Sequence, residues 1–214
     1  MAWQVYYTGD SPQFPDYLIK SWSVPYLCLF TKKRRRRISK AEWQEAGLQA
    51  ISERGIDSLT IEGLARSLGI NKSGFYWHFK NRDDLLRQLL KYWTHEITEV
   101  ISENPEILKV EPRQRLVTIA EMILDYDLNR YELGIRHWAM QDAGAAMAVE
   151  KVNQLRLDFI GKAFSELGFS GDDLEMRTML FVGYHSGESI IFREISQKRL
   201  RKLINKRIDL LTSK

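Results

Sequence analysis

Apolar positions recur at helical spacing along most of the chain after Ile38, and polar positions fill the faces between them. This period of three and four residues is typical of amphipathic α-helices, and no stretch convincingly shows the alternation that predicts a strand. The sequence therefore predicts an all-α fold. Capping and breaking signals, among them a break at Asn104-Pro105, place helices over residues 39–54, 60–68, 71–79, 81–101, from Pro112, 130–141, 145–167, 172–195 and 197–211.

The second and third of these helices form the most informative part of the pattern. Ser58 or Thr60 can cap the first of the two, and Gly69 can take the left-handed backbone that ends it. Asn71 can cap the next helix, which is polar and only about two turns long. A short polar helix docked on another helix is the shape that enters a DNA major groove, so this segment predicts a helix-turn-helix unit.

Charge is distributed unevenly along the chain. Residues 32–82 hold 12 Lys/Arg and 5 Asp/Glu, residues 83–192 hold 11 and 19, and residues 193–214 hold 8 and 2. The first positive segment coincides with the helix-turn-helix unit, as a module that faces phosphates requires. The acidic middle is expected to point away from DNA.

A run of six basic residues, 32–37, precedes the first helix. It predicts a basic arm that contacts DNA through residues such as Arg36 and Arg37, following phosphates or entering a minor groove. The alternative is a solvated tail.

Residues 1–31 are rich in aromatic residues and follow no lasting period. They are interpreted as a poorly ordered segment or an extension from too early a start codon, and alternatively as an arm that packs on the body or a partner.

Several classes of function find no support in the sequence. One cysteine, Cys28, excludes an internal disulfide framework and a thiolate zinc site. There is no nucleophile motif, metal-ligand spacing or Gly-rich phosphate loop, so we expect no enzyme activity, metal or cofactor. No run approaches the ~20 apolar residues of a membrane span, and a cytoplasmic location is the default expectation.

A family resemblance covers about 60 residues. The first helix ends in Glu-Arg-Gly, and the motif continues as Leu59-Thr60-Ile61, Leu64-Ala65, Leu68-Gly69-Ile70 and Phe75-Tyr76-Trp77-His78-Phe79-Lys80-Asn81-Arg82. In this order and spacing, residues 38–97 resemble the DNA-binding domain of the tetracycline-repressor (TetR) family of bacterial transcriptional regulators. The resemblance implies a motif at about residues 60–79, and a helical regulatory and dimerisation domain over residues 98–214.

The resemblance also implies which residues meet DNA. Lys72 and Ser73 are expected at base edges, Tyr76 is expected at a base edge, a thymine methyl or a phosphate, and Gly74 is expected to allow close approach. The side chains expected at phosphates are those of Thr60, Trp77, His78, Lys80 and Arg82. Phe75 and Phe79 are expected in the core. Tyr76 and Trp77 are alternatively part of the core, and His78 is alternatively a satisfied core histidine.

For the second domain the resemblance implies a homodimer through the last two helices, which reads a pseudo-palindromic operator in double-stranded DNA. Close packing is expected of Met176, Met179, Leu180, Val182, Gly183 and Gly187. It further implies a small-molecule effector among the middle helices. The candidate effector residues are Trp93, Tyr126, His137, Trp138, Met140, Tyr184 and His185, each with ordinary core packing as the alternative.

The resulting hypothesis is a homodimeric repressor, bacterial and bound to the nucleoid, that a small molecule releases from its operator. The long helix from Asn81 is the expected lever between the two domains. An activator or a regulator without a ligand would have the same DNA module. A helical interaction module or a membrane-surface module, using the basic run and the aromatic segment, is the alternative from another class.

Overall fold

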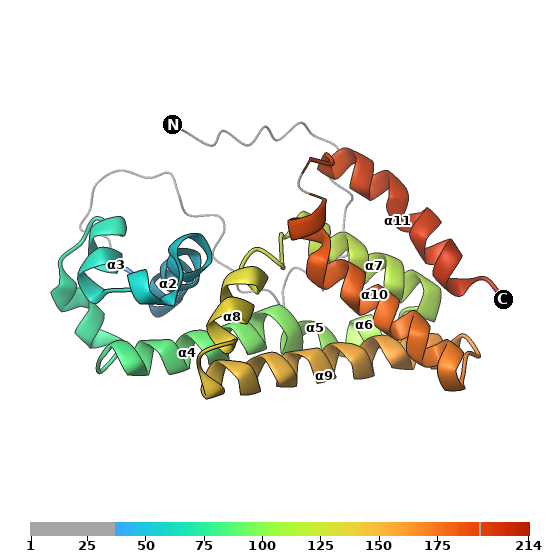
Figure 1. Ribbon diagram of the computed structural model, residues 1–214, viewed down its shortest axis with the longest axis horizontal. Coiled ribbons are helices and arrows are strands. Elements are labelled where there is room, and N and C mark those ends of the chain that lie inside the picture. Colours follow the sequence, from blue (N-terminus) through green and yellow to red (C-terminus); the bar gives the residue numbers. More distant parts are fainter. Residues whose placement is uncertain (1–36, 193) are drawn as a thin grey trace. The chain divides into compact units, whose positions relative to one another are not determined.

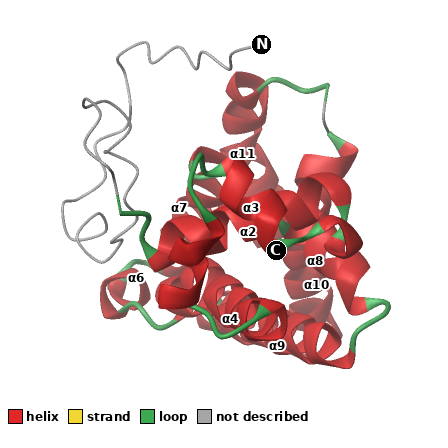
Figure 2. Ribbon diagram, turned by 90° about the vertical axis from the view of Figure 1, so that its left-hand side faces the viewer, coloured by secondary structure: helices red, strands yellow, loops and turns green. Residues whose placement is uncertain are grey.

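The computed structural model describes residues 37–192 and 194–214, and the secondary structure of this part is helical throughout (Figures 1 and 2). The predicted all-α fold is thereby confirmed. The predictions for residues 1–31 and for Arg36 lie outside the described residues. No described helix combines the length and apolar character that crossing a bilayer demands.

The first helices begin at the predicted caps. In α2 (Lys40–Arg54), the Glu42 amide donates to Ser39 Oγ and the Ser39 amide donates to the Glu42 carboxylate, a complete capping box. A short 3₁₀ turn, η1 (Ile56–Ser58), follows α2. Of the two candidate caps for α3 (Ile61–Ser67), Thr60 is the one used, because its hydroxyl accepts the Gly63 amide at 3.0 Å. Local side-chain chemistry therefore fixes where both helices start.

The predicted long helix is present, with one irregularity. It starts as α4 (Arg82–Thr94), passes through a π-helical turn, η3 (His95–Glu99), and ends as α5 (Val100–Ser102). The predicted break at Asn104-Pro105 ends this helix but also starts another, α6 (Pro105–Lys109), which was not predicted. The Asn104 side chain accepts the Glu106 amide, and proline suits the first helical position because it has no N–H to satisfy.

The remaining helices are α7 (Pro112–Asp125), α8 (Glu132–Ala139), α9 (Ala143–Glu166), α10 (Gly171–Ile191) and α11 (Gln197–Thr212). The helix α9 contacts α4, α7, α8 and α10, and α11 packs on α7 (Figure 1). The predicted ranges were too long for two of these helices, because α8 is shorter than 130–141 and α10 ends before residue 195.

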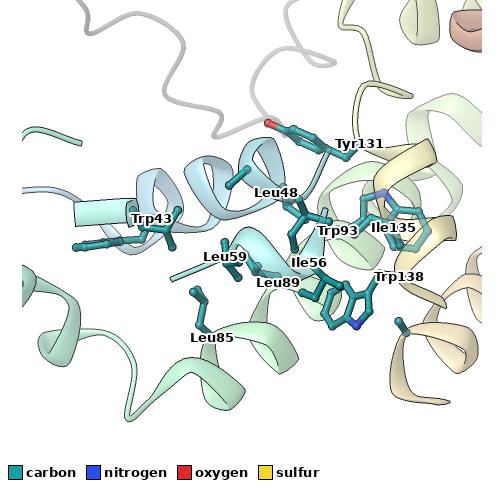
Figure 3. Packing of buried hydrophobic residues seen from close by; sticks show 14 of the residues in the cluster. Trp43, Leu48, Ile56, Leu59, Leu85, Leu89, Trp93, Tyr131, Ile135 and Trp138 are labelled. Carbon is teal, nitrogen blue, oxygen red and sulfur yellow. The ribbon is translucent and has the colours of Figure 1, made fainter. Parts of the chain in front are cut away.

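The apolar core of the N-terminal helices continues into α8 (Figure 3). Trp43 of α2 and Leu89 and Trp93 of α4 have no exposed surface. The same cluster includes Ile135 and Trp138 of α8. Burying these side chains together stabilises the contact by the usual hydrophobic free energy, ~25 cal/mol per Å² of apolar surface. The helix-turn-helix module is therefore built partly on a helix of the second half of the chain.

At the centre of this contact, α8 lies against α2 backbone to backbone. A Cβ atom on Gly134 would lie 2.7 Å from Ser52 Cα and 2.9 Å from the Ser52 amide nitrogen. The Ser52 hydroxyl also donates to the Arg130 carbonyl oxygen at 2.9 Å, just before α8. Only glycine permits this approach, because the atoms it faces belong to the backbone and cannot rotate away.

Replacing Gly134 with alanine should therefore lower the free energy of unfolding by about 1–3 kcal/mol, the usual cost of forcing one extra carbon into a packed interior. Urea unfolding measures this change. The matched control is Gly161→Ala in α9, where the new Cβ would meet Thr178 only at 3.6 Å. Equal stability of the two variants would show that the contact between α2 and α8 is looser than described.

Candidate DNA-binding site

The turn of the motif depends on Gly69, whose φ of 68° lies in the left-handed region that glycine favours. The helix that follows, η2 (Lys72–Trp77), is about two turns long as predicted, but it is a 3₁₀-helix and not an α-helix. Asn71 precedes it in extended conformation, and its side chain makes no capping hydrogen bond. The predicted cap position is thus correct, while the predicted capping interaction is absent.

The inner side of η2 is anchored by aromatic packing. Phe75 is fully buried and meets the Trp43 ring edge-on, with ring centroids 5.5 Å apart. Phe79 is 2% exposed and lies 5.1 Å from Phe75 by the same measure. Both were predicted to be core residues, and both are. Because one side of the helix is fixed in this way, its other side faces outward.

The outward side carries the residues expected at DNA. Lys72 and Ser73 are exposed, Tyr76 is 57% exposed, and Trp77 is 75% exposed. The alternative that the two aromatic residues belong to the core is therefore wrong. At Gly74 a Cβ would meet its nearest neighbour, Ile70, at 3.6 Å, which is ordinary contact, so the fold itself does not require glycine there. Contact of these residues with DNA remains a prediction.

Lys72 forms an ion pair with Glu62 of α3, with Nζ and Oε1 3.1 Å apart. The pKa of Glu62 lies below its ordinary value, first because of its own backbone hydrogen bond and then because of Lys72. Both side chains are more than half exposed, so the pair contributes little to stability. Lys72 can leave Glu62 for another acceptor at small cost.

The start of the first helix is tied to the end of η2. The His78 ring nitrogen Nε2 donates to the Ile38 carbonyl oxygen at 3.0 Å, and His78 is half-buried. The guanidinium of Arg37 lies 5.5 Å from the centre of the Trp77 ring. His78 thus matches its alternative, a satisfied histidine, more closely than a free phosphate donor. Arg37 is exposed beside the motif.

Arg82, which was predicted to pin a phosphate, has hydrogen bonds inside the protein, and its contact with a phosphate stays a prediction. Its Nε donates to the Leu59 carbonyl oxygen at 2.8 Å, and Nη2 donates to the Ile56 carbonyl oxygen at 2.9 Å. These carbonyls belong to the first residue of η1 and to the residue that follows η1, so Arg82 fastens α4 to the start of the motif. Thr60 uses its oxygen as the cap of α3 but keeps a hydroxyl proton to donate, and Lys80 is exposed.

A cavity of about 60 Å³ lies in the second half of the chain. Its lining comes from η3, α5, α7, α9, α10 and the segment before α8: Thr98, Ile101, Ser102, Ile119, Ile123, Leu128, Asn129, Arg156, Phe159, Ile160, Phe181, Val182, His185 and Ser186. The predicted lever therefore does reach the cavity, through Thr98, Ile101 and Ser102.

Of the seven predicted effector residues, only His185 lines this cavity. Trp93 and Trp138 belong to the core shared by α2, α4 and α8, while His137 and Met140 are exposed. Tyr126 and Tyr184 are half-buried elsewhere. The prediction selected residues by type, whereas a cavity lining is decided by which helix faces meet, so contact of these six residues with an effector stays a prediction. The prediction also missed Arg156 and Ser186, for which the sequence offers no local signal.

His185 belongs to a buried polar group that joins α10 to α11. Its Nδ1 lies 3.1 Å from Glu188 Oε2, and its Nε2 lies 3.3 Å from Nη2 of Arg207. Burial lowers the pKa of His185, so the neutral ring is favoured. In that ring Nδ1–H donates to Glu188 and Nε2 accepts from Arg207. Burial alone would raise the pKa of Glu188, but the His185 hydrogen bond and the Arg207 charge lower it.

No three His, Cys, Asp or Glu side chains of the described residues gather in a group that could hold a metal ion. Two groups are candidates for binding a ligand, the exposed side of η2 and the lining of the cavity. The first presents donors and aromatic rings to the outside, and the second is partly open and mainly apolar.

Residues 45–89 match the family model of bacterial regulatory proteins of the tetR family. Over these residues the chain has the sequence pattern of the tetR family. This match covers α2 from Glu45, the turn, η2 and most of α4, and it confirms the resemblance stated from the sequence.

The relatives that the chain resembles include a tetracycline repressor and an HTH-type transcriptional regulator. Tetracycline repressor protein class G of Vibrio anguillarum is 31% identical over 102 residues, which are 47% of this chain and 49% of the relative. The transcriptional regulator TtgR of Pseudomonas putida is 28% identical over 112 residues, 49% of this chain and 52% of the relative. The chain thus spans about half the length of these tetR-family relatives.

Solved structures show the same fold over a longer part of the chain. A TetR-like transcriptional regulator from Rhodococcus sp. RHA1 matches with a TM-score of 0.63 and 17% identity, over 85% of this chain and 100% of that one. The regulator FadR from Bacillus subtilis, solved with stearoyl-CoA, matches with a TM-score of 0.61 and 17% identity, over 82% and 98%. At this identity the likeness shows the fold alone.

The role of Arg82 leads to a test of stability. The Arg82→Gln variant loses the hydrogen bonds to the Ile56 and Leu59 carbonyls, and hydrogen bonds to charged groups contribute about 1.5–3 kcal/mol each, so the free energy of unfolding should fall by at least about 1.5–3 kcal/mol. Urea unfolding measures it. The control is Lys80→Gln, an exposed site where a change within about 0.5 kcal/mol is expected. An unchanged free energy of unfolding in Arg82→Gln would show that Arg82 is free to donate to a phosphate.

Proposed function

We propose that the chain is a transcriptional regulator that binds a pseudo-palindromic operator as a homodimer and is released from it by a small molecule. The observation that carries this proposal is the η2 helix, which is fixed by Phe75 on one side and exposes Lys72, Ser73 and Tyr76 on the other. The match of residues 45–89 to the tetR-family model supports the same reading.

In the proposed complex η2 enters the major groove. Lys72 donates to guanine O6 or N7, Ser73 and Tyr76 contact base edges, and Gly74 leaves room for the DNA backbone. Thr60, Trp77, Lys80 and Arg37 contact phosphates, which position the module without reading sequence. Arg82 and His78 act inside the protein by holding α4 and the first helix against the motif.

The homodimer is proposed to form through the outer side of α10. Met176, Met179 and Leu180 are each more than half exposed, and Gly183 follows them on the same helix. A contiguous apolar strip of this kind is a usual mark of a protein interface. Val182, which was predicted to share it, lines the cavity instead. Two-fold pairing places two recognition helices ~34–36 Å apart, one turn of DNA, and explains a palindromic operator.

The effector is proposed to enter the cavity at the end of the lever. Solved relatives of the fold include FadR with stearoyl-CoA and AibR with isovaleryl coenzyme A and operator DNA. A ligand that binds better when the two recognition helices are misaligned shifts the population toward that state. At about 60 Å³ the cavity is well below the ~300–1,000 Å³ of sites for drug-sized ligands, so a small effector fits it better.

Selection of bound genomic fragments in vitro would supply an operator on which the proposal is tested. Replacing Lys72 or Tyr76 with alanine should weaken binding to this operator by about 1–3 kcal/mol each, because each removes a contact to a base edge. Fluorescence anisotropy measures the affinity, and circular dichroism checks that the variants fold. Mass photometry should count two chains per operator duplex.

The control is Lys198→Ala on α11, which removes the same charge from an exposed site far along the chain from the motif. It should leave the operator affinity nearly unchanged. Failure to select any preferred duplex, or equal affinities for all three variants and the parent chain, would reject the proposed function. One chain per duplex would reject the dimer.

A further inference from the structure

The cavity has one charged side chain in a mainly apolar wall. Arg156 of α9 lines it, together with apolar residues such as Ile119, Phe159 and Phe181. The Arg156 guanidinium is largely buried and bonds Glu132 of α8 through both terminal nitrogens, at 3.1 Å each. Glu132 has no exposed surface and is not part of the cavity lining, so it engages Arg156 away from the cavity.

The charges around Arg156 do not balance. Glu132 also accepts from Nε of Arg136 at 2.8 Å, so one carboxylate serves two guanidinium groups. The second partner of Arg136 is the neutral Asn153 side chain, at 2.7 Å, and the second partner of Arg156 is the Ser186 hydroxyl, at 3.5 Å. This group therefore has two guanidinium groups for one carboxylate; Arg136 is partly exposed to solvent, whereas Arg156 is largely buried.

The neighbouring polar group does not supply the missing negative charge. Glu188 is engaged by His185 and lies 3.9 Å from Arg207, which balances it. His185 is neutral because burial lowers its pKa. Among the described residues, the polar end of the cavity thus offers a guanidinium and a hydroxyl to a ligand but no negative charge.

We propose that this cavity binds a small carboxylate, whose anionic group pairs with Arg156 and Ser186 and whose apolar part lies among the isoleucine and phenylalanine side chains. The inference rests on the proposed function, in that it names the chemical class of the effector. A guanidinium suits this role, because its fork of N–H groups matches a carboxylate in two bonds. With only about 60 Å³ available, the ligand has a short chain unless the walls move.

The same contact connects the cavity to the DNA-binding module. A carboxylate that takes Arg156 weakens its bonds to Glu132, and Glu132 is two residues from Gly134, where α8 touches the backbone of α2. Ile135 and Trp138 of α8 are in the core of the module. Loss of the Arg156 anchor therefore frees α8 to shift together with α2. Binding of the ligand then lowers the affinity for the operator through α8, and by thermodynamic linkage binding of the operator lowers the affinity for the ligand by the same factor.

Isothermal titration of the full chain tests the ligand class without DNA. The probes are isobutyrate and hexanoate, each compared with its neutral amide of the same shape, isobutyramide and hexanamide. At least one of the two carboxylates should bind, and at least about tenfold more tightly than its amide, a ratio that corresponds to ~1.4 kcal/mol. Equal binding of the acid and the amide, or no binding of either carboxylate, overturns the proposal. This comparison needs no variant and therefore does not depend on variant folding.

Three variants then locate the site. Arg156→Gln should weaken carboxylate binding by about tenfold or more. The matched control Arg136→Gln removes the same charge from the same carboxylate but not from the cavity lining, and it should retain binding. Glu132→Gln removes the carboxylate that competes with the ligand for Arg156, so it should tighten carboxylate binding. Structural damage would weaken that binding instead. Equal losses in Arg156→Gln and Arg136→Gln, or weaker binding by Glu132→Gln, overturn the assignment.

Adding the carboxylate that binds to the operator complex, followed by fluorescence anisotropy, tests the connection through α8. Release of the operator from the parent chain supports it, and Arg156→Gln should bind the operator more weakly than the parent chain even without ligand, because this variant lacks the anchor to Glu132. Binding without release overturns the connection while leaving the ligand class intact. If no operator exists and the proposed function fails, the titrations still decide what the cavity binds.

Discussion

The contact between α2 and α8 at Gly134 is the constraint on which both halves of this chain depend. It brings the backbone of α8 so close to Ser52 that no side chain larger than hydrogen fits. Around it, Ile135 and Trp138 complete the core of the DNA-binding module. The module therefore takes its position from α8, and any displacement of α8 moves the surface that is proposed to face DNA.

On its other side α8 is held by charge. Glu132, fully buried, receives hydrogen bonds from Arg136 and Arg156, and Arg156 reaches the cavity. Burying charged groups is costly unless they are paired, and breaking such a pair costs more than forming it gains. An anionic ligand that competes with Glu132 for Arg156 consequently weakens the hold of this pair on α8. An apolar contact in the same place would hold α8 equally well but would give an anionic ligand no means of loosening it.

Much of the fold could be predicted from local rules. Ser39, Thr60 and Asn81 cap helices as their positions indicated, Gly69 adopts the left-handed turn, and Phe75 and Phe79 are buried. These predictions succeeded because a cap or an amphipathic period depends on residues within one or two turns. The 3₁₀ form of η2 and the short helix α6 were missed, since they depend on small differences between alternative helical backbones.

The candidate site was only partly predictable, because several of its residues are held by partners far away along the chain. The exposure of Tyr76 and Trp77 follows from their spacing relative to Phe75, which is local. Arg82, in contrast, binds carbonyls more than twenty residues away, and Arg156 meets Glu132 across 24 residues of chain. No periodicity reveals such pairs. The cavity lining combines six segments, so residue type alone selected side chains that the fold uses elsewhere.

Native-state hydrogen exchange tests the dependence on α8 most directly. If the DNA-binding module is built on α8, the most protected amides of α2 and of α8 should open with the same free energy, as one cooperative unit. The expected result is a single opening free energy for Ile51 in α2 and Ile135 in α8, which falls equally for both as urea is added. Exchange of α2 at a clearly lower free energy than α8 would show a module that opens alone, and would contradict the account.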